Sequence, residues 1–272
     1  MAPGNDKPGH ITRRPGGVAL NIAMMIRRFG LQPALISVLG DDAAGRDLRA
    51  RCAAMGLMCD TILIDADLPT DQYMAIEAQG ALMAAVADAH SLEAAGARIL
   101  APLEDGRLGS AARPWAGLVA LDGNLTEPLL DAIAQSPLFS KADLRIAPAS
   151  PGKAARLRPF LAHPRATLYL NREEAAILTG TEAADAARAA QALIAAGARR
   201  VLVTAGAGVA VDASAAGLIQ AAPPVVTARR ITGAGDTFMA AHIAAERAGL
   251  PAQAALERAA AAAAAYVSGV DP

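Results

Sequence analysis

The sequence has little cysteine, few aromatic residues and no long apolar run. Only two of its 272 residues are cysteines and 3% are aromatic, although 54% are hydrophobic. Cys52 and Cys59 are too few to form the disulfide framework of a small secreted domain. The longest alanine-rich run, residues 259–267, is far shorter than the ~20 residues needed to span a bilayer. Neither a disulfide scaffold nor a membrane-spanning protein is therefore expected.

An excess of charge is also missing. The formal net charge is −1, and the basic residues are spread along the chain, so no patch for nucleic acid or an anionic membrane stands out. The first nine residues lack the apolar stretch of a secretory signal. We therefore expect a soluble, cytoplasmic protein that acts on a small molecule, and 272 residues suffice for one large domain with a buried core.

Short apolar segments rich in β-formers alternate with helical patterns along most of the chain. This alternation is typical of βαβ units on a parallel sheet. The expected strands are residues 34–39, 117–121, 144–147, 167–170 and 201–204. The expected helices are residues 17–29, 43–54, 129–134, 152–161, 172–178, 182–196, 236–248 and 252–267.

One segment, residues 61–92, differs from this pattern. It contains three short strand-like runs, 61–64, 73–76 and 82–87, of which the first two are joined by Asp and Pro turns. We expect an antiparallel patch that projects from the main sheet as a lid.

The strongest local motif is Thr-Gly-Ala-Gly-Asp at residues 232–236, directly before an amphipathic run. Glycines just before a helix let the backbone turn its free N–H groups toward a ligand, and the helix dipole adds positive potential there. The turn thus fits a phosphate-sized anion. An alternative is that Thr232 or Asp236 merely caps the helix.

A second motif combines the pair Gly16 and Gly17 with Asn21, and Gly-Asp-Asp follows at residues 40–42. A glycine pair lets a hydroxyl-rich ligand approach the backbone, and Asn21, one turn into the helix, offers both a donor and an acceptor.

These two motifs, in this order, resemble the two signatures of the ribokinase/PfkB carbohydrate kinases. Asn171 and Glu174 are similar to that family's Asn-x-x-Glu motif, and residues 203–209 are similar to its nucleotide-binding glycine turn. The resemblance implies an α/β fold, a ribokinase-like three-layer sandwich with a central mostly parallel sheet and a small antiparallel β lid. It implies a single kinase domain over residues 1–272, with lid segments at about 8–16 and 61–92.

The resemblance also implies an ATP- and Mg²⁺-dependent kinase. Asp236 would be the base that accepts the proton of a primary hydroxyl, and the N–H groups of residues 233–236 would hold the transferred phosphoryl group. The implied catalytic turn comprises Gly233, Ala234, Gly235 and Asp236. Implied substrate contacts are Gly16, Gly17, Asn21, Asp122 and Asn124. Implied cofactor contacts are Asn171, Thr204, Gly206, Gly208 and Thr232, with Glu174 and Asn171 orienting Mg²⁺ through water. A Walker-type sequence and a dinucleotide-binding Gly-x-Gly-x-x-Gly fingerprint are both absent.

Two further blocks bear on the substrate. Asp122 to Leu125 and Ser150 to Ala154, with Asn-Asp-Lys-Pro-Gly at residues 5–9, resemble blocks of the pseudouridine kinase branch. The first expectation is therefore phosphorylation of the pseudouridine 5′-hydroxyl, with ribose, fructose or ketodeoxygluconate as alternatives. The other interpretation is that Asp122 and Ser150 only end strands and cap the segments that follow.

The sequence departs from the family at two places. Family members carry a first strand with Gly and a substrate-binding Asp well before the glycine pair, whereas Gly16 stands almost at the start here. This leaves two alternatives open. Either the start of the chain was assigned too late, or the chain is an N-terminally truncated, weakly active binding or regulatory paralogue. Arg230 stands where ribokinases place an Asp for a monovalent cation, so we expect no such K⁺ site. Lid strands of the family often pair across dimers, which makes a homodimer possible.

Overall fold

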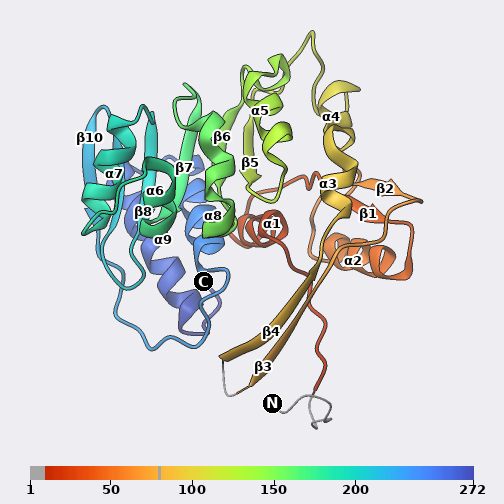
Figure 1. Cartoon of the computed structure of the whole chain (residues 1–272), viewed down its shortest axis with the longest axis horizontal. Helices are drawn as coiled ribbons and strands as arrows, with labels where there is room; N and C mark the ends of the chain where they lie inside the picture. Colours follow the sequence, from red (N-terminus) through yellow and green to blue (C-terminus); the bar gives the residue numbers. More distant parts are fainter. Residues whose placement is uncertain (1–9, 79–80) are drawn as a thin grey trace.

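A six-stranded sheet forms the centre of the computed structural model, which describes residues 10–78 and 81–272 (Figure 1). The strand order is β10-β9-β8-β7-β6-β5, in which β5 to β8 are parallel and β9 and β10 are antiparallel to their neighbours. The strands are β5 Leu118–Asp122, β6 Asp143–Ala147, β7 Ala166–Asn171, β8 Arg200–Thr204, β9 Ala210–Ser214 and β10 Gly217–Ala221. The predicted α/β class with a mostly parallel sheet is confirmed.

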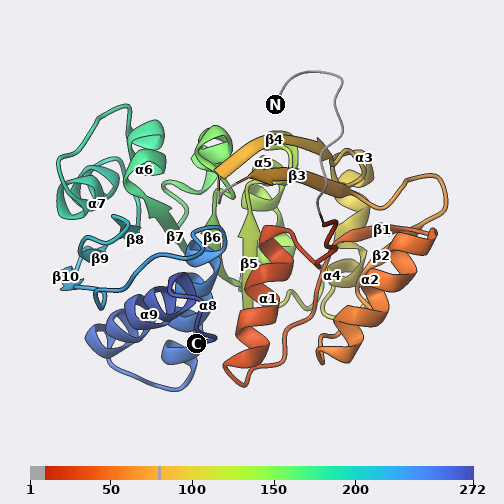
Figure 2. The same cartoon turned by 90° about the horizontal axis from the view of Figure 1, so that it is seen from below.

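Helices cover both faces of this sheet and complete three layers (Figures 1 and 2). One face packs against α1 Val18–Arg28, α8 Ala234–Arg247 and α9 Ala252–Val267. The other packs against α5 Glu127–Gln135, the 3₁₀-helices η2 Pro137–Phe139 and η3 Pro151–Phe160, α6 Arg172–Thr179 and α7 Ala186–Ala195. Each face has its own buried apolar cluster, so the sheet is shielded from water on both sides, as a parallel sheet requires.

A smaller region contains the remaining elements. A two-stranded parallel sheet, β1 Val38–Gly40 and β2 Leu63–Asp65, lies beside α2 Ala43–Ala54. The short helices α3 Ser91–Ala95, η1 Gly96–Leu100 and α4 Ala101–Glu104 follow the antiparallel hairpin of β3 Gln72–Ala78 and β4 Ala81–Asp88. No helix within residues 10–78 and 81–272 is both long and apolar enough to cross a membrane.

The structure corrects the predicted lid. Only β3 and β4 form the antiparallel patch, because Leu63 and Ile64 pair in parallel with Val38 and Leu39 instead. Residues 10–16 contain no strand or helix, and residues 8 and 9 of the other predicted lid segment lie outside the described residues, as does the motif at 5–9.

Three other segments differ from the predictions. Residues 152–161 lie mostly in a 3₁₀-helix, in which Pro159 has no N–H to donate and disfavours α-helical bonding. The strand predicted at 34–39 is regular only from Val38, since its partner strand is three residues long. The strands β9 and β10 were not predicted, because their Ala and Gly residues have low β-propensity.

Asp42 holds the base of the hairpin. Its carboxylate caps α2 by accepting from the N–H of Gly45 at 2.7 Å, and it also accepts from the N–H and hydroxyl of Thr70, both at 2.8 Å. A Cβ at Gly45 would lie 2.2 Å from the carbonyl oxygen of Gly40, so only glycine fits there. The Gly-Asp-Asp motif therefore fixes where the chain enters β3.

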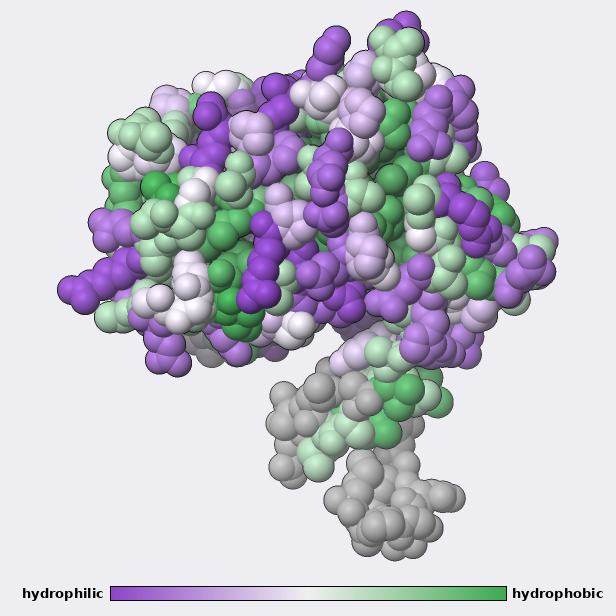
Figure 3. Space-filling model, turned by 45° about the horizontal axis from the view of Figure 1, so that its top comes forward, coloured by the Kyte–Doolittle hydropathy of each residue, from purple (hydrophilic) through white to green (hydrophobic). Residues whose placement is uncertain are grey.

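The hairpin projects from the body of the protein and carries apolar side chains on its surface (Figure 3). Tyr73, Met74 and Val86 are 66%, 62% and 60% exposed. The predicted homodimer stays a prediction.

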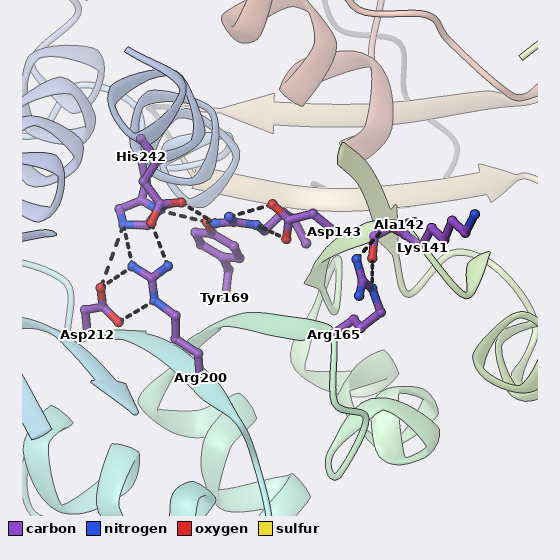
Figure 4. A network of polar contacts seen from close by, with 10 residues as sticks. Lys141, Ala142, Asp143, Arg165, Tyr169, Arg200, Asp212 and His242 are labelled. Atoms are coloured by element: carbon purple, nitrogen blue, oxygen red, sulfur yellow. Dashed lines mark hydrogen bonds and ion pairs between the residues drawn. The ribbon is translucent and has the colours of Figure 1, made fainter. Parts of the chain in front are cut away.

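A network of charged side chains lies between the sheet and α8 (Figure 4). Glu246 of α8 accepts hydrogen bonds from Arg145 of β6 and Arg200 of β8. Arg200 also donates to both carboxylate oxygens of Asp212 on β9, at 2.9 and 2.6 Å. Arg145 is only 9% exposed, so its charge needs the carboxylates around it.

We expect Glu246→Gln to lower the free energy of unfolding by about 2–3 kcal/mol, because two largely buried guanidinium groups lose a shared carboxylate. Urea unfolding followed by circular dichroism measures the effect. Asp47→Asn is the matched control, since its ion pair with Arg51 on α2 is exposed and should contribute less than about 0.5 kcal/mol. Equal effects of the two substitutions would contradict the assigned role of Glu246.

Candidate active site

The predicted site residues of the sheet lie at the carboxyl ends of its parallel strands. Asp122 ends β5, Asn171 ends β7 and Thr204 ends β8. The register places Asp122 opposite Ala147 and Asn171 opposite Thr204. In open α/β sheets, ligands bind at this edge. The fold therefore gathers these residues on the side where a substrate is expected.

Asp236 stands in the first turn of α8, behind the N-cap Gly233. Gly233 has φ +92°, a conformation that favours glycine. Within the described residues, no acceptor contacts the N–H groups of Gly235 and Asp236, whereas Ala234 donates to the carbonyl of Ile231 at 3.0 Å. Three of the four predicted donors, the N–H groups of Gly233, Gly235 and Asp236, thus have no acceptor in the part of the chain that the structure describes, at a helix N-terminus, where an anion is favoured.

Asn21 directly contacts Asp236 from another helix. Its Nδ2 donates to Oδ2 of Asp236 at 2.9 Å, across 215 residues of sequence. Asn21 lies one turn into α1, and its own N–H donates to the carbonyl of the N-cap Gly17 at 2.8 Å. The two signature motifs therefore meet in one hydrogen bond.

The carboxyl group of Asp236 has a perturbed pKa. Burial raises it to about 6, the hydrogen bond from Asn21 lowers it, and the nearby carboxylate of Asp122 raises it. A carboxylate with a pKa near 6 is ionised at neutral pH and is a stronger base than an ordinary aspartate.

Asp122 is buried beside these groups. Its Oδ1 accepts from the N–H of Asn124 at 2.7 Å. Burial raises the pKa of Asp122. The N–H groups of Asn124 and Ala19 and the positive charge of Lys153 act in the opposite direction and lower it. Because Ala19 belongs to α1, one of the groups that lower the pKa of Asp122 comes from the helix that carries Asn21.

Lys153 is a further candidate site residue, which was not among those predicted from the sequence. Its Nζ donates to Oδ1 of Asn124 at 2.6 Å, from the 3₁₀-helix η3. The preceding Ala149 has φ +71°, a strained value for a residue with a side chain. The available signal was the Ser-x-x-Lys-Ala block itself, whose lysine reaches toward the same strand end as Asp122.

Asn171 and Glu174 form a capping box at the start of α6. Oε2 of Glu174 accepts from the N–H of Asn171 at 2.8 Å, and Oδ1 of Asn171 accepts from the N–H of Glu174 at 2.9 Å. Burial raises the pKa of Glu174. One carboxylate oxygen is left, which fits a hydrated Mg²⁺ bound mainly by phosphates. Residues 10–78 and 81–272 contain no cluster of three or more metal-ligating side chains.

The remaining predicted residues lie around the same edge. Thr204, Gly206 and Gly208 belong to the turn between β8 and β9, where the N–H of Gly208 donates to the carbonyl of Ala205 at 2.9 Å. Gly16 precedes α1 with open space around it. In the described part of the chain, hydrogen bonds join Asn21 to Asp236, and none joins the Asn171 and Glu174 pair to them.

This arrangement agrees with the comparison to protein families. The family model described as pfkB family carbohydrate kinase matches residues 2–271. The chain belongs to the PfkB carbohydrate kinase family. A curated relative is the pseudouridine kinase of Escherichia coli K12, 29% identical over 181 residues. The match covers 65% of this chain and spans only 54% of that enzyme's length.

Solved structures show the same fold. A putative sugar kinase from Clostridium perfringens superposes with a TM-score of 0.83 at 22% identity, covering 100% of this chain and 85% of that one. A putative ribokinase II from E. coli, solved in complex with ATP and Mg²⁺, has a TM-score of 0.76 at 21% identity, with coverages of 98% and 87%. The ribokinase-like fold predicted for the PfkB chain is confirmed.

The pKa of Asp236 leads to a prediction for the pH dependence of phosphoryl transfer. If Asp236 is the base of a phosphoryl transfer, its carboxylate must be ionised, so kcat/KM should fall about tenfold per pH unit below its pKa, which is about 6 in the free protein. Asn21→Ala removes a hydrogen bond that lowers this pKa and should move the acid limb to higher pH. Asp122→Asn removes a repelling charge and should move it to lower pH.

Profiles of kcat/KM against pH for the three proteins provide the measurement, with circular dichroism at each pH to exclude unfolding. The assignment of Asp236 as the titrating base is contradicted if the acid limb of the pH profile stays in place in both variants, or if it moves in the same direction in both.

Proposed function

We propose that this chain transfers the γ-phosphoryl group of ATP to a primary hydroxyl of a nucleoside or sugar. The observation that carries the proposal is the first turn of α8. It presents a carboxylate with a pKa of about 6 next to the free N–H groups of Gly235 and Asp236. Phosphoryl transfer needs a base at the attacking oxygen and donors at the transferred group, and this turn supplies both.

In the proposed reaction, Asp236 accepts the proton of the substrate hydroxyl. The hydroxyl oxygen forms a bond to the γ-phosphorus while the bond from phosphorus to the bridging oxygen breaks, and ADP leaves. The N–H groups of Gly235 and Asp236 hold the charge on the phosphoryl oxygens. The protein mainly positions the reactants and stabilises charge.

We propose ATP as the donor because the chain belongs to the PfkB family and because the E. coli putative ribokinase II of the same fold was solved with ATP and Mg²⁺. Mg²⁺, when bound, would neutralise phosphate charge, and Glu174 and Asn171 would hold it through water. The proposed nucleotide contacts are Asn171, Thr204, Gly206, Gly208 and Thr232.

For the acceptor, we propose the 5′-hydroxyl of pseudouridine as the first candidate. The identity to pseudouridine kinase supports this choice. Asp122 and Asn124 offer a carboxylate and an amide for ribose hydroxyls, and Lys153 adds a donor beside them. Asn21 and the open backbone at Gly16 and Gly17 would contact the same sugar. Ribose, fructose and ketodeoxygluconate are the other sugars that such a set of groups could bind.

Replacement of the base tests the proposal. We expect Asp236→Asn to lower kcat at least ~100-fold, because the amide cannot accept the proton, while its shape leaves the fold intact. Turnover of ATP would be measured with pseudouridine, ribose, fructose, ketodeoxygluconate and adenosine, for wild type and variant. Equal rates in the two proteins would overturn the role of Asp236.

Uridine is the matched comparison for pseudouridine, since the two nucleosides differ only in the atom of the base that joins the ribose. A higher kcat/KM for pseudouridine supports the proposed substrate, and a preference for a free sugar rejects it. Calorimetric binding of a sugar or nucleoside without phosphate transfer by wild type would reject the kinase activity and favour a binding or regulatory protein.

A further inference from the structure

The segment that precedes the catalytic turn has no regular structure. Residues 222–232 connect β10 to α8 without a strand or helix, and Val225 and Ile231 on it are exposed. The segment ends directly at Gly233 and the free N–H groups of α8. The position of these groups therefore depends on how the last residues of the segment are attached to the rest of the protein.

The attachment is made at the carboxyl end of α9. The N–H groups of Arg229 and Arg230 both donate to the carbonyl of Val267, at 2.9 and 3.2 Å. Nε of Arg230 donates to the carbonyl of Tyr266 at 2.7 Å. Carbonyls in the last turn of a helix lack intrahelical partners, and a cation is favoured at this end by the helix dipole. Arg230 thus joins the segment to the end of α9 through both its backbone N–H and its guanidinium group.

Tyr266 extends this attachment to the start of α8. The guanidinium of Arg230 lies 3.8 Å from the centroid of the Tyr266 ring, a cation–π distance. The hydroxyl of Tyr266 donates to the carbonyl of Thr232 at 3.0 Å. A Cβ at Gly233 would lie 2.6 Å from that hydroxyl oxygen. One aromatic side chain therefore contacts both residues that lead into the catalytic turn.

Asp271 adds a charged contact to the same group. Its Oδ1 lies 3.3 Å from Nη2 of Arg230 and 2.9 Å from Nη1 of Arg28 on α1. The Asp271 side chain is 67% exposed, so water and salt screen these pairs. The hydroxyl of Tyr266 and the backbone N–H groups of Arg229 and Arg230 are consequently the contacts of the attachment that involve no ion pair.

We propose that Arg230 and Tyr266 form a latch that sets the position of the first turn of α8, and with it the carboxylate of Asp236. Both are positioning residues, since they act through Thr232 and Gly233. The kinetic consequence rests on the proposed phosphoryl transfer. A displaced catalytic turn lowers kcat, because the base and the N–H donors must meet the reacting atoms within a fraction of an ångström.

Tyr266→Phe is the sharpest test, because it removes only the hydroxyl that contacts Thr232 and keeps the ring under Arg230. Arg230→Met removes the cation and its hydrogen bond, and Arg230→Lys restores the charge. Arg229→Met is the matched control, since its backbone N–H contact survives the substitution. The readouts are kcat and KM for the best acceptor and amide hydrogen exchange, in the ligand-free full chain, at Arg229, Arg230 and Ala234, whose N–H groups are hydrogen-bonded.

We expect Tyr266→Phe and Arg230→Met to speed exchange at these three amides about fivefold or more, the effect of one lost hydrogen bond. We expect kcat to fall about tenfold or more with KM for the acceptor unchanged, and Arg230→Lys to recover part of both effects. Arg229→Met should behave as wild type. Unchanged exchange in both latch variants, or the same change in Arg229→Met, overturns the latch. If wild type transfers no phosphate, the proposed function fails while the exchange result still decides the latch.

Discussion

Buried charge beneath α8 is the constraint on which the rest of the structure depends. Arg145 and Arg200 project from two strands of the sheet into a region with little water, where an unpaired guanidinium is costly. Glu246 pairs with both, so α8 cannot slide or rotate on the sheet without separating these charges. His242, one turn earlier, has its pKa lowered to about 4, mainly by burial, and therefore stays neutral against Tyr169 and adds no further cation.

The two ends of α8 satisfy their polar groups in different ways. Among the residues that the structure describes, every buried side-chain polar atom has a partner, and the network around Glu246 contributes many of these bonds. At the other end, the N–H groups of Gly235 and Asp236 are left without one. Ten residues of helix separate Asp236 from Glu246, a rise of about 15 Å. The network thus holds the carboxyl-terminal part of α8 on the sheet, while the N–H groups of its first turn remain available to a ligand.

Local motifs could be predicted from the sequence because their geometry is local. The turn at 232–236 and Asn21 one turn into α1 each need only a few neighbouring residues, and the parallel sheet then brings its strand ends to one edge. Glu174 shows the limit of such patterns. An Asn-x-x-Glu sequence at a helix start is also the pattern of a capping box, which is the contact that the structure contains.

Contacts between distant residues could not be predicted in the same way. The bond from Tyr266 to Thr232 spans 34 residues and that from Arg145 to Glu246 spans 101, and both depend on how helices pack on the sheet. Residues 61–64 were predicted to belong to the antiparallel lid, whereas their strand belongs to a parallel pair. This difference has the same origin, since β-rich runs of three or four residues do not specify their partner strand. The Ala and Gly residues of β9 and β10 made the β-strand pattern of these segments too weak for a strand to be predicted.

An amide at position 21 suits the role of base that we propose for Asp236. A lysine or arginine in hydrogen-bond contact with Asp236 would hold its carboxylate strongly ionised and lower its pKa far below neutrality, which weakens it as a base. Asn21 orients the same oxygen without a charge, and burial then sets the pKa to about 6. The charge of Arg230 is paired with Asp271 and Tyr266 and is not among the groups that shift the pKa of Asp236. In the proposed latch, the turn is therefore anchored by a cation whose charge does not lower the pKa of the carboxylate beside it.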